Sequence, residues 1–243
     1  LLTIQWQAVE IALFSMELAM INAGFGRHIE TLEVDKILYL SKMNWARDFV
    51  YDTALFLSKL AALLFLARVF PRASNTRRFN YALWTTLGLN AAWLIGIYFG
   101  TIFFCWPISK NWMTTESGYC GTQFNLLVGS AVPSVVIDLI ILILPLPKLW
   151  HLRISRVKKV GLMSVFILVV VVSLGRLITI TTQLDAVAAD FTYALIPTYY
   201  WVSAEVPVTI VSISLPAMLP LGRHLSSNFF TPLASIVSSY ITT

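Results

Sequence analysis

Six apolar segments, separated by shorter polar connections, divide the chain. They run over residues 1–23, 47–70, 81–104, 123–147, 160–182 and 196–221. Each reaches the roughly 20 residues that a helix needs to cross a hydrocarbon core. The first is the weakest, because Gln5, Gln7, Glu10 and Glu17 dilute it. A helix satisfies its own backbone hydrogen bonds in lipid, and no alternating pattern indicates a barrel, so we predict an all-α, polytopic transmembrane helix bundle.

Composition agrees with a membrane protein. The chain is 58% hydrophobic and 12% charged, whereas a soluble domain has about 25% charged residues. Its mean hydropathy is +0.77. The net charge of +5 is not arranged as a basic stripe with interleaved aromatic residues, so we expect no nucleic-acid partner. No linker or internal repeat divides the sequence, and we expect a single helical domain over residues 1–243.

Positive charge gathers in alternate connections and predicts the orientation. The connections after the second and fourth segments carry Arg68, Arg72, Arg77, Arg78, Arg153, Arg156, Lys158 and Lys159. The connections 24–46, 105–122 and 183–195 instead carry acids, alone or mixed with bases. Cytoplasmic loops are enriched in Lys and Arg, so we expect the basic connections and the C-terminus inside. Snorkelling of cations at helix ends would not explain their absence from the other side.

The two cysteines, Cys105 and Cys120, both fall on the predicted outer face. An oxidising exterior permits a disulfide, and closing a loop of about 15 residues contributes about 3 kcal/mol in the chain-entropy model. The alternative is two unpaired thiols. Two ligands with no nearby histidine do not support a metal site.

Charged and amide side chains inside the segments are candidates for pairing or for a ligand site. They are Glu10, Glu17, Asp52, Lys59, Asn90, Asp138, Arg176 and Glu205. A charge at mid-bilayer costs about 2.5–3.5 kcal/mol on insertion scales, so such groups usually face the bundle interior and pair. Counting residues from the outer face places Lys59 and Asp138 near the middle, and Arg176 and Glu205 in the outer part. We therefore predict the pairs Lys59–Asp138 and Arg176–Glu205.

Two questions about these residues stay open from the sequence. Glu17 or Asp52 is an alternative partner for Arg176. The pairs either only fix helix register, since polar contacts join helices in membranes, or they form part of a ligand or ion site together with Asn90.

Small residues at Ala92, Gly96 and Gly100 form a stripe along one face of the third segment. Such stripes let two helices approach closely in membranes. We therefore expect close helix packing at this stripe.

Catalytic motifs of soluble enzymes are absent from the sequence. It contains no H-E-x-x-H, phosphate loop or G-x-S-x-G. The three histidines, His28, His151 and His224, are scattered over both predicted faces. We therefore expect no enzymatic activity, no metal and no cofactor.

Several stretches, in their order and spacing, resemble one known family. They are GFGRH (24–28), SKLAALLFLARVFP (58–71), CWPISKNW (105–112) with the later Cys120, DLIILILPLPKLW (138–150), SLGR (173–176) and AEVPVTIVSISLPAMLPL (204–221). The chain is thereby similar to the fungal rhodopsin-domain family of seven-helix membrane proteins, some receptor-like and some encoded in secondary-metabolite clusters. The resemblance implies that the family's first helix is missing here, which would bring the six spans to seven. Pro207 departs from the family pattern.

Opsin-type retinal proteins hold retinal on a lysine of the last helix. The segment 196–221 has no lysine, and the deep membrane lysine is Lys59. We therefore predict no retinal.

These observations favour a receptor-like sensor in the plasma membrane. Its partners would be the lipid bilayer, an unknown small ligand, and a G protein or another cytoplasmic partner at the basic loops. The alternatives are a transporter or exporter, in which the buried charges titrate along a path, or a membrane accessory protein of a secondary-metabolite pathway.

Overall fold

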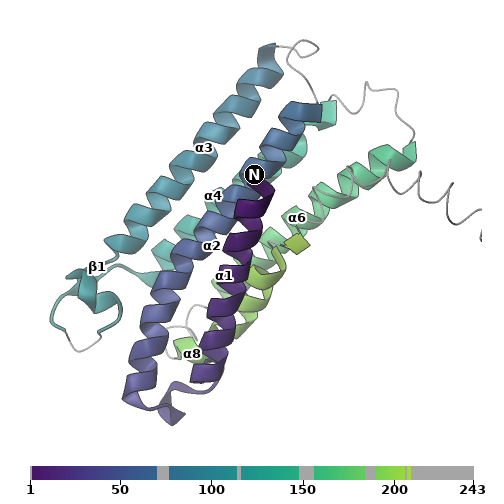
Figure 1. Cartoon of the computed structure of the whole chain (residues 1–243). Coiled ribbons are helices and arrows are strands. Elements are labelled where there is room, and N and C mark those ends of the chain that lie inside the picture. The colour runs from purple at the N-terminus through teal and green to yellow at the C-terminus, as the bar shows by residue number, and fades with distance from the viewer. Residues whose placement is uncertain are drawn as a thin grey trace, which may run out of the picture.

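The computed structural model describes residues 2–69, 77–113, 116–147, 156–183, 190–205 and 207–208. It is a bundle of long helices that run roughly alongside one another (Figure 1). The long helices are α1 (Leu2–Ala23), α2 (Val34–Val69), α3 (Arg77–Ile102), α4 (Gln123–Ile143) and α6 (Arg156–Thr182). Residues 196–205 form a further helix after the short α8 (Phe191–Ala194). The predicted all-α bundle is confirmed.

Three of the described helices are long and apolar enough to cross a membrane. They are Val34–Arg68, Arg77–Ile102 and Asn125–Ile143, and Ile167–Thr182 is a shorter apolar helix. The helices also show large apolar side chains on the outside of the bundle, among them Phe14, Ile21, Ile95, Phe99, Ile143 and Ile178. Broad apolar surface of this kind is unfavourable in water and matches a lipid environment. The total of six spans stays a prediction, because most of 196–221 lies outside the described residues.

The largest difference from the predicted helix boundaries is at the start of α2. α2 begins at Val34 rather than at 47, so the predicted outer connection ends early. The segment 34–46 contains neither Gly nor Pro, and Asp35 in the first turn suits the positive end of the helix dipole.

Six of the predicted loop cations lie in helices instead. Arg68 is in the last turn of α2. Arg77 and Arg78 begin α3, and Arg156, Lys158 and Lys159 begin α6. Arg72 and Arg153 lie outside the described residues. The cations therefore mark the last turn of α2 and the first turns of α3 and α6, as well as the connections between these helices.

The connections separate onto the two ends of the bundle (Figure 1). One end, called here the hairpin end, carries η1 (Ile29–Thr31), β1 (Cys105–Trp106), η3 (Ile108–Asn111), β2 (Tyr119–Cys120) and α8. At the opposite end, called here the basic end, α2 and α4 finish and α3 and α6 begin. Arg68, Arg77 and Arg78 are exposed at the basic end. This separation agrees with the two-sided topology that the charges predict.

The predicted disulfide is present at the hairpin end. Strands β1 and β2 pair antiparallel with Cys105 opposite Cys120, and the two cysteines form the disulfide. Gly118 lies against this hairpin, where a Cβ atom would collide with the carbonyl oxygen of Trp106. The connection between α3 and α4 is therefore a tightly closed hairpin.

Close helix packing occurs at Gly175 and not at the predicted stripe. A Cβ atom on Gly96 would have no atom within 4 Å. Gly96 and Gly100 instead line an open groove of about 700 Å³ between α3 and α4. A Cβ atom on Gly175 would lie 2.6 Å from the indole ring of Trp201. The small residues of α3 thus leave a gap, whereas Gly175 lets α6 pack against the helix 196–205.

Candidate ligand pocket and buried ion-pair network

The structure pairs Lys59 with Asp138, as the depth count predicts. Lys59 Nζ on α2 lies 2.6 Å from Asp138 Oδ1 on α4, and only 3% and 5% of the two side chains are exposed. Lys59 Nζ also donates to the backbone oxygen of Ser134 at 2.8 Å. Because Ser134 and Asp138 are four residues apart on one helix face, a single amine bridges both.

The second predicted pair, Arg176–Glu205, is also present. Arg176 Nε on α6 lies 3.1 Å from Glu205 Oε2, and both side chains are 2% exposed. The Nε–H bond does not meet hydrogen-bond geometry, so this contact is an ion pair. Arg176 Nη2 donates to Ser134 Oγ at 3.2 Å, and Tyr51 Oη donates to Glu205 Oε2 at 3.0 Å. Ser134 therefore connects the two pairs.

Ser173 closes the network. Its Oγ lies 2.8 Å from Asp138 Oδ2 and 2.8 Å from Glu205 Oε1. A serine hydroxyl carries one hydrogen, so both contacts are hydrogen bonds only when one of the two carboxyl groups carries a proton. The network of Lys59, Asp138, Ser173, Glu205, Arg176 and Ser134, called here the ion-pair network, joins α2, α4, α6 and the helix 196–205.

A neighbouring cluster holds Glu17, and its partner is Arg47 rather than Arg176. Arg47 Nη2 on α2 lies 2.9 Å from Glu17 Oε1 on α1. Ser203 Oγ donates to the other oxygen of Glu17 at 2.9 Å. The Arg47 guanidinium also lies over the ring of Tyr199 at 3.7 Å from its centroid. The alternative pairing of Glu17 with Arg176 is therefore wrong.

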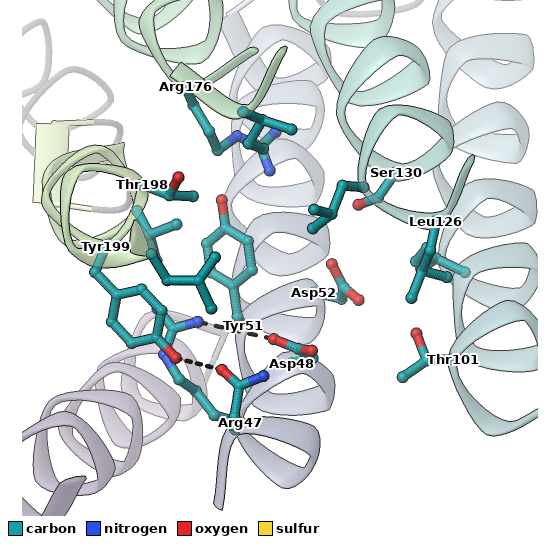
Figure 2. Close-up of a pocket in the computed structure, with 16 residues that line it drawn as sticks. Arg47, Asp48, Tyr51, Asp52, Thr101, Leu126, Ser130, Arg176, Thr198 and Tyr199 are labelled. Atoms are coloured by element: carbon teal, nitrogen blue, oxygen red, sulfur yellow. Dashed lines mark hydrogen bonds and ion pairs between the residues drawn. The ribbon is translucent and has the colours of Figure 1, made fainter. Parts of the chain in front are cut away.

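A pocket of about 100 Å³ lies between these two clusters, towards the hairpin end. Figure 2 shows ten of its lining residues by name, contributed by α2, α3, α4, α6 and the helix 196–205. Its wall includes Arg47, Asp48, Tyr51, Asp52, Ser130, Arg176 and Tyr199. Arg176 therefore belongs to both the pocket wall and the ion-pair network.

Asp52 lines this pocket without a partner. It is 5% exposed, and none of the described residues forms a hydrogen bond or ion pair with it within 4 Å. Its alternative pairing with Arg176 is therefore not formed in the structure. Asp48, one helical turn earlier, lies 3.8 Å from Arg47 Nη1, which is too long for a hydrogen bond.

The other predicted residues lie apart from the pocket. Asn90 is fully buried; its Nδ2 donates to the backbone oxygen of Phe56 at 3.1 Å, while its Oδ1 has no partner among the described residues. Glu10 is half-buried on α1 and forms no ion pair within the described part of the chain. Among the described residues, no three His, Cys, Asp or Glu side chains come close enough to hold a metal ion.

Sequence reasoning missed four charged or titratable residues of the pocket. They are Arg47, Asp48, Tyr51 and Tyr199. The sequence spacing could have revealed three of them. Arg47 and Tyr51 are four residues apart, as are Asp48 and Asp52, so they form two polar rows on one side of α2. Because the second segment was predicted to begin at 47, these residues fell at its edge and were not considered as part of the bundle interior.

The motif GFGRH links α1 to α8 at the hairpin end. Gly24 and Gly26 have φ of 109° and 98°, values that a residue with a Cβ atom rarely adopts. This turn places His28 Nδ1 at 2.9 Å from Asp190 Oδ2. Burial alone would raise the pKa of Asp190, but hydrogen bonds from Thr192, His28 and the backbone of Ile29 and Tyr193 hold that pKa below its ordinary value.

Known proteins match most of the chain. The sequence model of the fungal rhodopsin domain matches residues 2–224. The chain is 29% identical to a "SAT4 family membrane protein" of Emericella nidulans, over 87% of this chain and 53% of that protein. It is 26% identical to "Polyenoic acids biosynthesis gene cluster protein Ba17b" of Metarhizium anisopliae, over 91% of this chain and 62% of that protein.

A third relative, "Phomoidride biosynthesis cluster protein H" of Fungal sp. (strain ATCC 74256), is 24% identical over 70% of this chain and 48% of its own length. The chain thus spans about half to three-fifths of the curated relatives it matches. No solved structure matches it. Because the domain match covers nearly the whole apolar bundle, the chain belongs to the fungal rhodopsin domain family of integral membrane proteins.

Proposed function

We propose that the protein is a receptor-like sensor of the plasma membrane that works without retinal and without catalysis. Its ligand enters the pocket between Arg47 and Arg176. The observation that carries this proposal is the double position of Arg176, which lines the pocket and is ion-paired to Glu205 in the network that joins four helices. A ligand that attracts or repels Arg176 would therefore change the contacts that hold these helices together.

The charge distribution supports an orientation for this sensor. With the basic end in the cytoplasm, the hairpin end with its disulfide and its pocket faces outside. The exposed Arg68, Arg77 and Arg78 would then meet a cytoplasmic partner such as a G protein, or anionic lipid. Glycosylation acceptors inserted in 24–33 and 105–122 should be modified, and acceptors in 68–80 should not. The reverse pattern would contradict the orientation.

The state of Lys59 supports function without retinal. Its amine is shared between Asp138 and the backbone oxygen of Ser134, so a Schiff base there would disrupt the centre of the network. Addition of retinal to the full-length protein should give no visible absorption band that depends on Lys59. A visible band that is lost in Lys59→Ala would overturn this part of the proposal.

The sensor proposal is tested by following the basic end while the network is perturbed. Both cysteines within residues 1–243 are in the disulfide. Once any cysteine outside these residues is replaced, spin labels at Arg68→Cys and Arg156→Cys report one distance between α2 and α6. In the full-length protein in nanodiscs, Asp138→Asn should shift this distance distribution, because it removes the ion pair between α4 and Lys59 of α2. Asp35→Asn, in the first turn of α2, is the matched control. An unchanged distribution in Asp138→Asn would contradict coupling through the network.

A transporter or exporter, or an accessory protein of a biosynthetic pathway, is the second candidate. It is supported by the names of two relatives, which associate them with biosynthesis gene clusters, and by the buried titratable groups. Proteoliposomes under a pH gradient test it. Proton or solute flux that is lost in Asp138→Asn would replace the sensor with a transporter. Loss of a metabolite on gene deletion, without flux, would favour the accessory role.

A further inference from the structure

Carboxyl groups outnumber cations around the pocket. Three cations, Arg47, Lys59 and Arg176, face five carboxyl groups. Each cation already has a carboxylate of its own: Glu17, Asp138 and Glu205, respectively. Asp48 and Asp52 are additional to these three, and both line the pocket. Asp48 has only a long contact of 3.8 Å to Arg47, which already binds Glu17, and Asp52 has no ion pair among the described residues.

The two remaining carboxyl groups lie together. They are one turn apart on α2, and in Figure 2 Asp52 points towards the side of the pocket that carries Ser130 and Thr101. Asp52 is 5% exposed and has no hydrogen-bond partner among the described residues. A buried carboxylate without a partner is unfavourable. The site must therefore be neutralised by protons or by a cation.

We propose that the pocket binds the ammonium group of a small organic amine between Asp48 and Asp52. This inference rests on the proposed sensor function, since it names the chemical class of the ligand for the same pocket. An ammonium group has three N–H donors, which suit the two carboxylates and the Ser130 hydroxyl at the pocket wall.

The remaining walls favour an organic cation over a metal ion. Ile97, Leu126 and Ile180 contribute apolar surface that a bare ion would leave unused. A divalent metal is disfavoured, because the described residues offer no group of three suitable ligands. The volume of about 100 Å³ is several times what a single water molecule needs. This space accommodates an ammonium group with a short carbon chain, and a longer amine would extend through the open mouth.

An anionic ligand fits less well, because both arginines are already engaged. Arg47 binds Glu17 and is covered by the ring of Tyr199. Arg176 binds Glu205 and Ser134. An anion would also meet the unpaired Asp52 in the same cavity.

Protons compete with the amine for the same carboxylates. The charged or titratable groups that face the pocket are Arg47, Asp48, Tyr51 and Asp52 from α2, Arg176 from α6 and Tyr199 from the helix 196–205. The residues that α3 and α4 contribute to the pocket are uncharged. Protonation removes the negative charge that holds the ammonium group, so binding should strengthen as the pH rises.

Ethylammonium is the probe for this inference. The full-length protein in nanodiscs is titrated with it, and the melting temperature is followed, since a ligand that binds only the native state raises it in a saturable way. Ethanol, propionate and potassium are the matched neutral, anionic and inorganic controls, and none should reproduce the rise. The apparent affinity for ethylammonium should increase with pH.

Two variants locate the site. Asp52→Asn should weaken the binding of ethylammonium at least about tenfold, the equivalent of about 1.4 kcal/mol. It should also raise the melting temperature of the ligand-free protein, because it removes an unpaired buried carboxylate. Asp48→Asn is the second variant, and it should leave the fold intact because 40% of that side chain is exposed. Asp48→Asn should also weaken the binding of ethylammonium. Asp35→Asn, which lies away from the pocket on α2, is the control and should leave the affinity unchanged.

The outcomes separate this inference from the sensor function. No saturable effect of ethylammonium, an equal effect of potassium or ethanol, or unchanged affinity in both variants would overturn the amine site. If ethylammonium binds but the label distance between positions 68 and 156 stays constant, the amine site stands and the sensor function fails. If Asp138→Asn changes that distance while ethylammonium does not bind, only the amine site fails.

Discussion

Lys59 Nζ lies 2.6 Å from Asp138 Oδ1, and the two side chains are almost fully enclosed by the bundle. They come from different helices, α2 and α4, at the same depth. Because both side chains are enclosed, each charge is tolerated only because the other is there. This reciprocal dependence gives the bundle one defined arrangement of α2 against α4.

The Lys59–Asp138 pair should be strongly coupled in stability. Lys59→Met leaves Asp138 as an unpaired buried charge and should lower the free energy of unfolding by about 3–5 kcal/mol. Adding Asp138→Leu should restore most of this loss, because the two apolar side chains no longer leave a charge behind. Denaturant titration in detergent micelles measures both effects.

Arg68→Met, on the exposed end of α2, is the control for that cycle and should change stability by no more than about 0.5 kcal/mol. If the effects of the Lys59 and Asp138 substitutions simply add, the pair does not contribute as a unit.

Gly175 and Gly96 should respond in opposite ways to alanine. Gly175→Ala places a methyl group within 2.6 Å of the Trp201 ring and should destabilise the protein by about 1–3 kcal/mol, as overpacking does. Gly96→Ala meets no atom within 4 Å and should be neutral or stabilising by about 0.4–1 kcal/mol. Melting temperatures and Trp fluorescence in detergent measure the difference. A destabilised Gly96→Ala would show that another surface packs on the α3–α4 groove.

The hairpin disulfide should contribute measurably to stability. The double substitution Cys105→Ser and Cys120→Ser should cost about 3 kcal/mol, because the closed loop restricts the unfolded chain. Dithiothreitol should lower the melting temperature of the native protein to that of the double variant, and the variant itself should not respond to it. Equal melting temperatures with and without the reductant, in a native protein shown to be reduced, would contradict this role.

Asp190 should make the hairpin end sensitive to acid. Hydrogen bonds hold its pKa below the ordinary value in the folded state, so the unfolded chain takes up a proton first as the pH falls. The stabilisation is therefore complete above the ordinary Asp pKa of about 3.9 and is lost as the pH falls through the lowered folded pKa. Asp190→Asn should be less stable than the native protein near neutral pH, and this difference should shrink in acid.

Melting curves recorded over the acid range measure this dependence, with Asp35→Asn as the control. An Asp190→Asn protein that keeps the full difference from the native protein at the lowest pH would show that the carboxylate charge is not the cause.

The sequence by itself determined the helical class, the two-sided charge distribution, the disulfide and both ion pairs of the network. These features depend on quantities that are read along one helix. A residue count gives the depth of Lys59 and Asp138, since each residue adds 1.5 Å, and a buried charge requires an opposite charge at its own depth. The disulfide was predicted in a similar way, because Cys105 and Cys120 both lie in the connection on the predicted outer face.

Only the tertiary structure decided which helix faces meet. The spacing within α2 cannot show that Arg47 faces Glu17 of α1 while Asp52 faces an open pocket, because both depend on how each helix is rotated against its neighbours. The same reason explains the glycines: Gly96 and Gly175 are alike in sequence, but only Gly175 is opposite a ring of another helix. The pocket and its unpaired Asp52 are consequences of this packing. The packing depends on how neighbouring helices are rotated against one another, which the sequence of one helix does not specify.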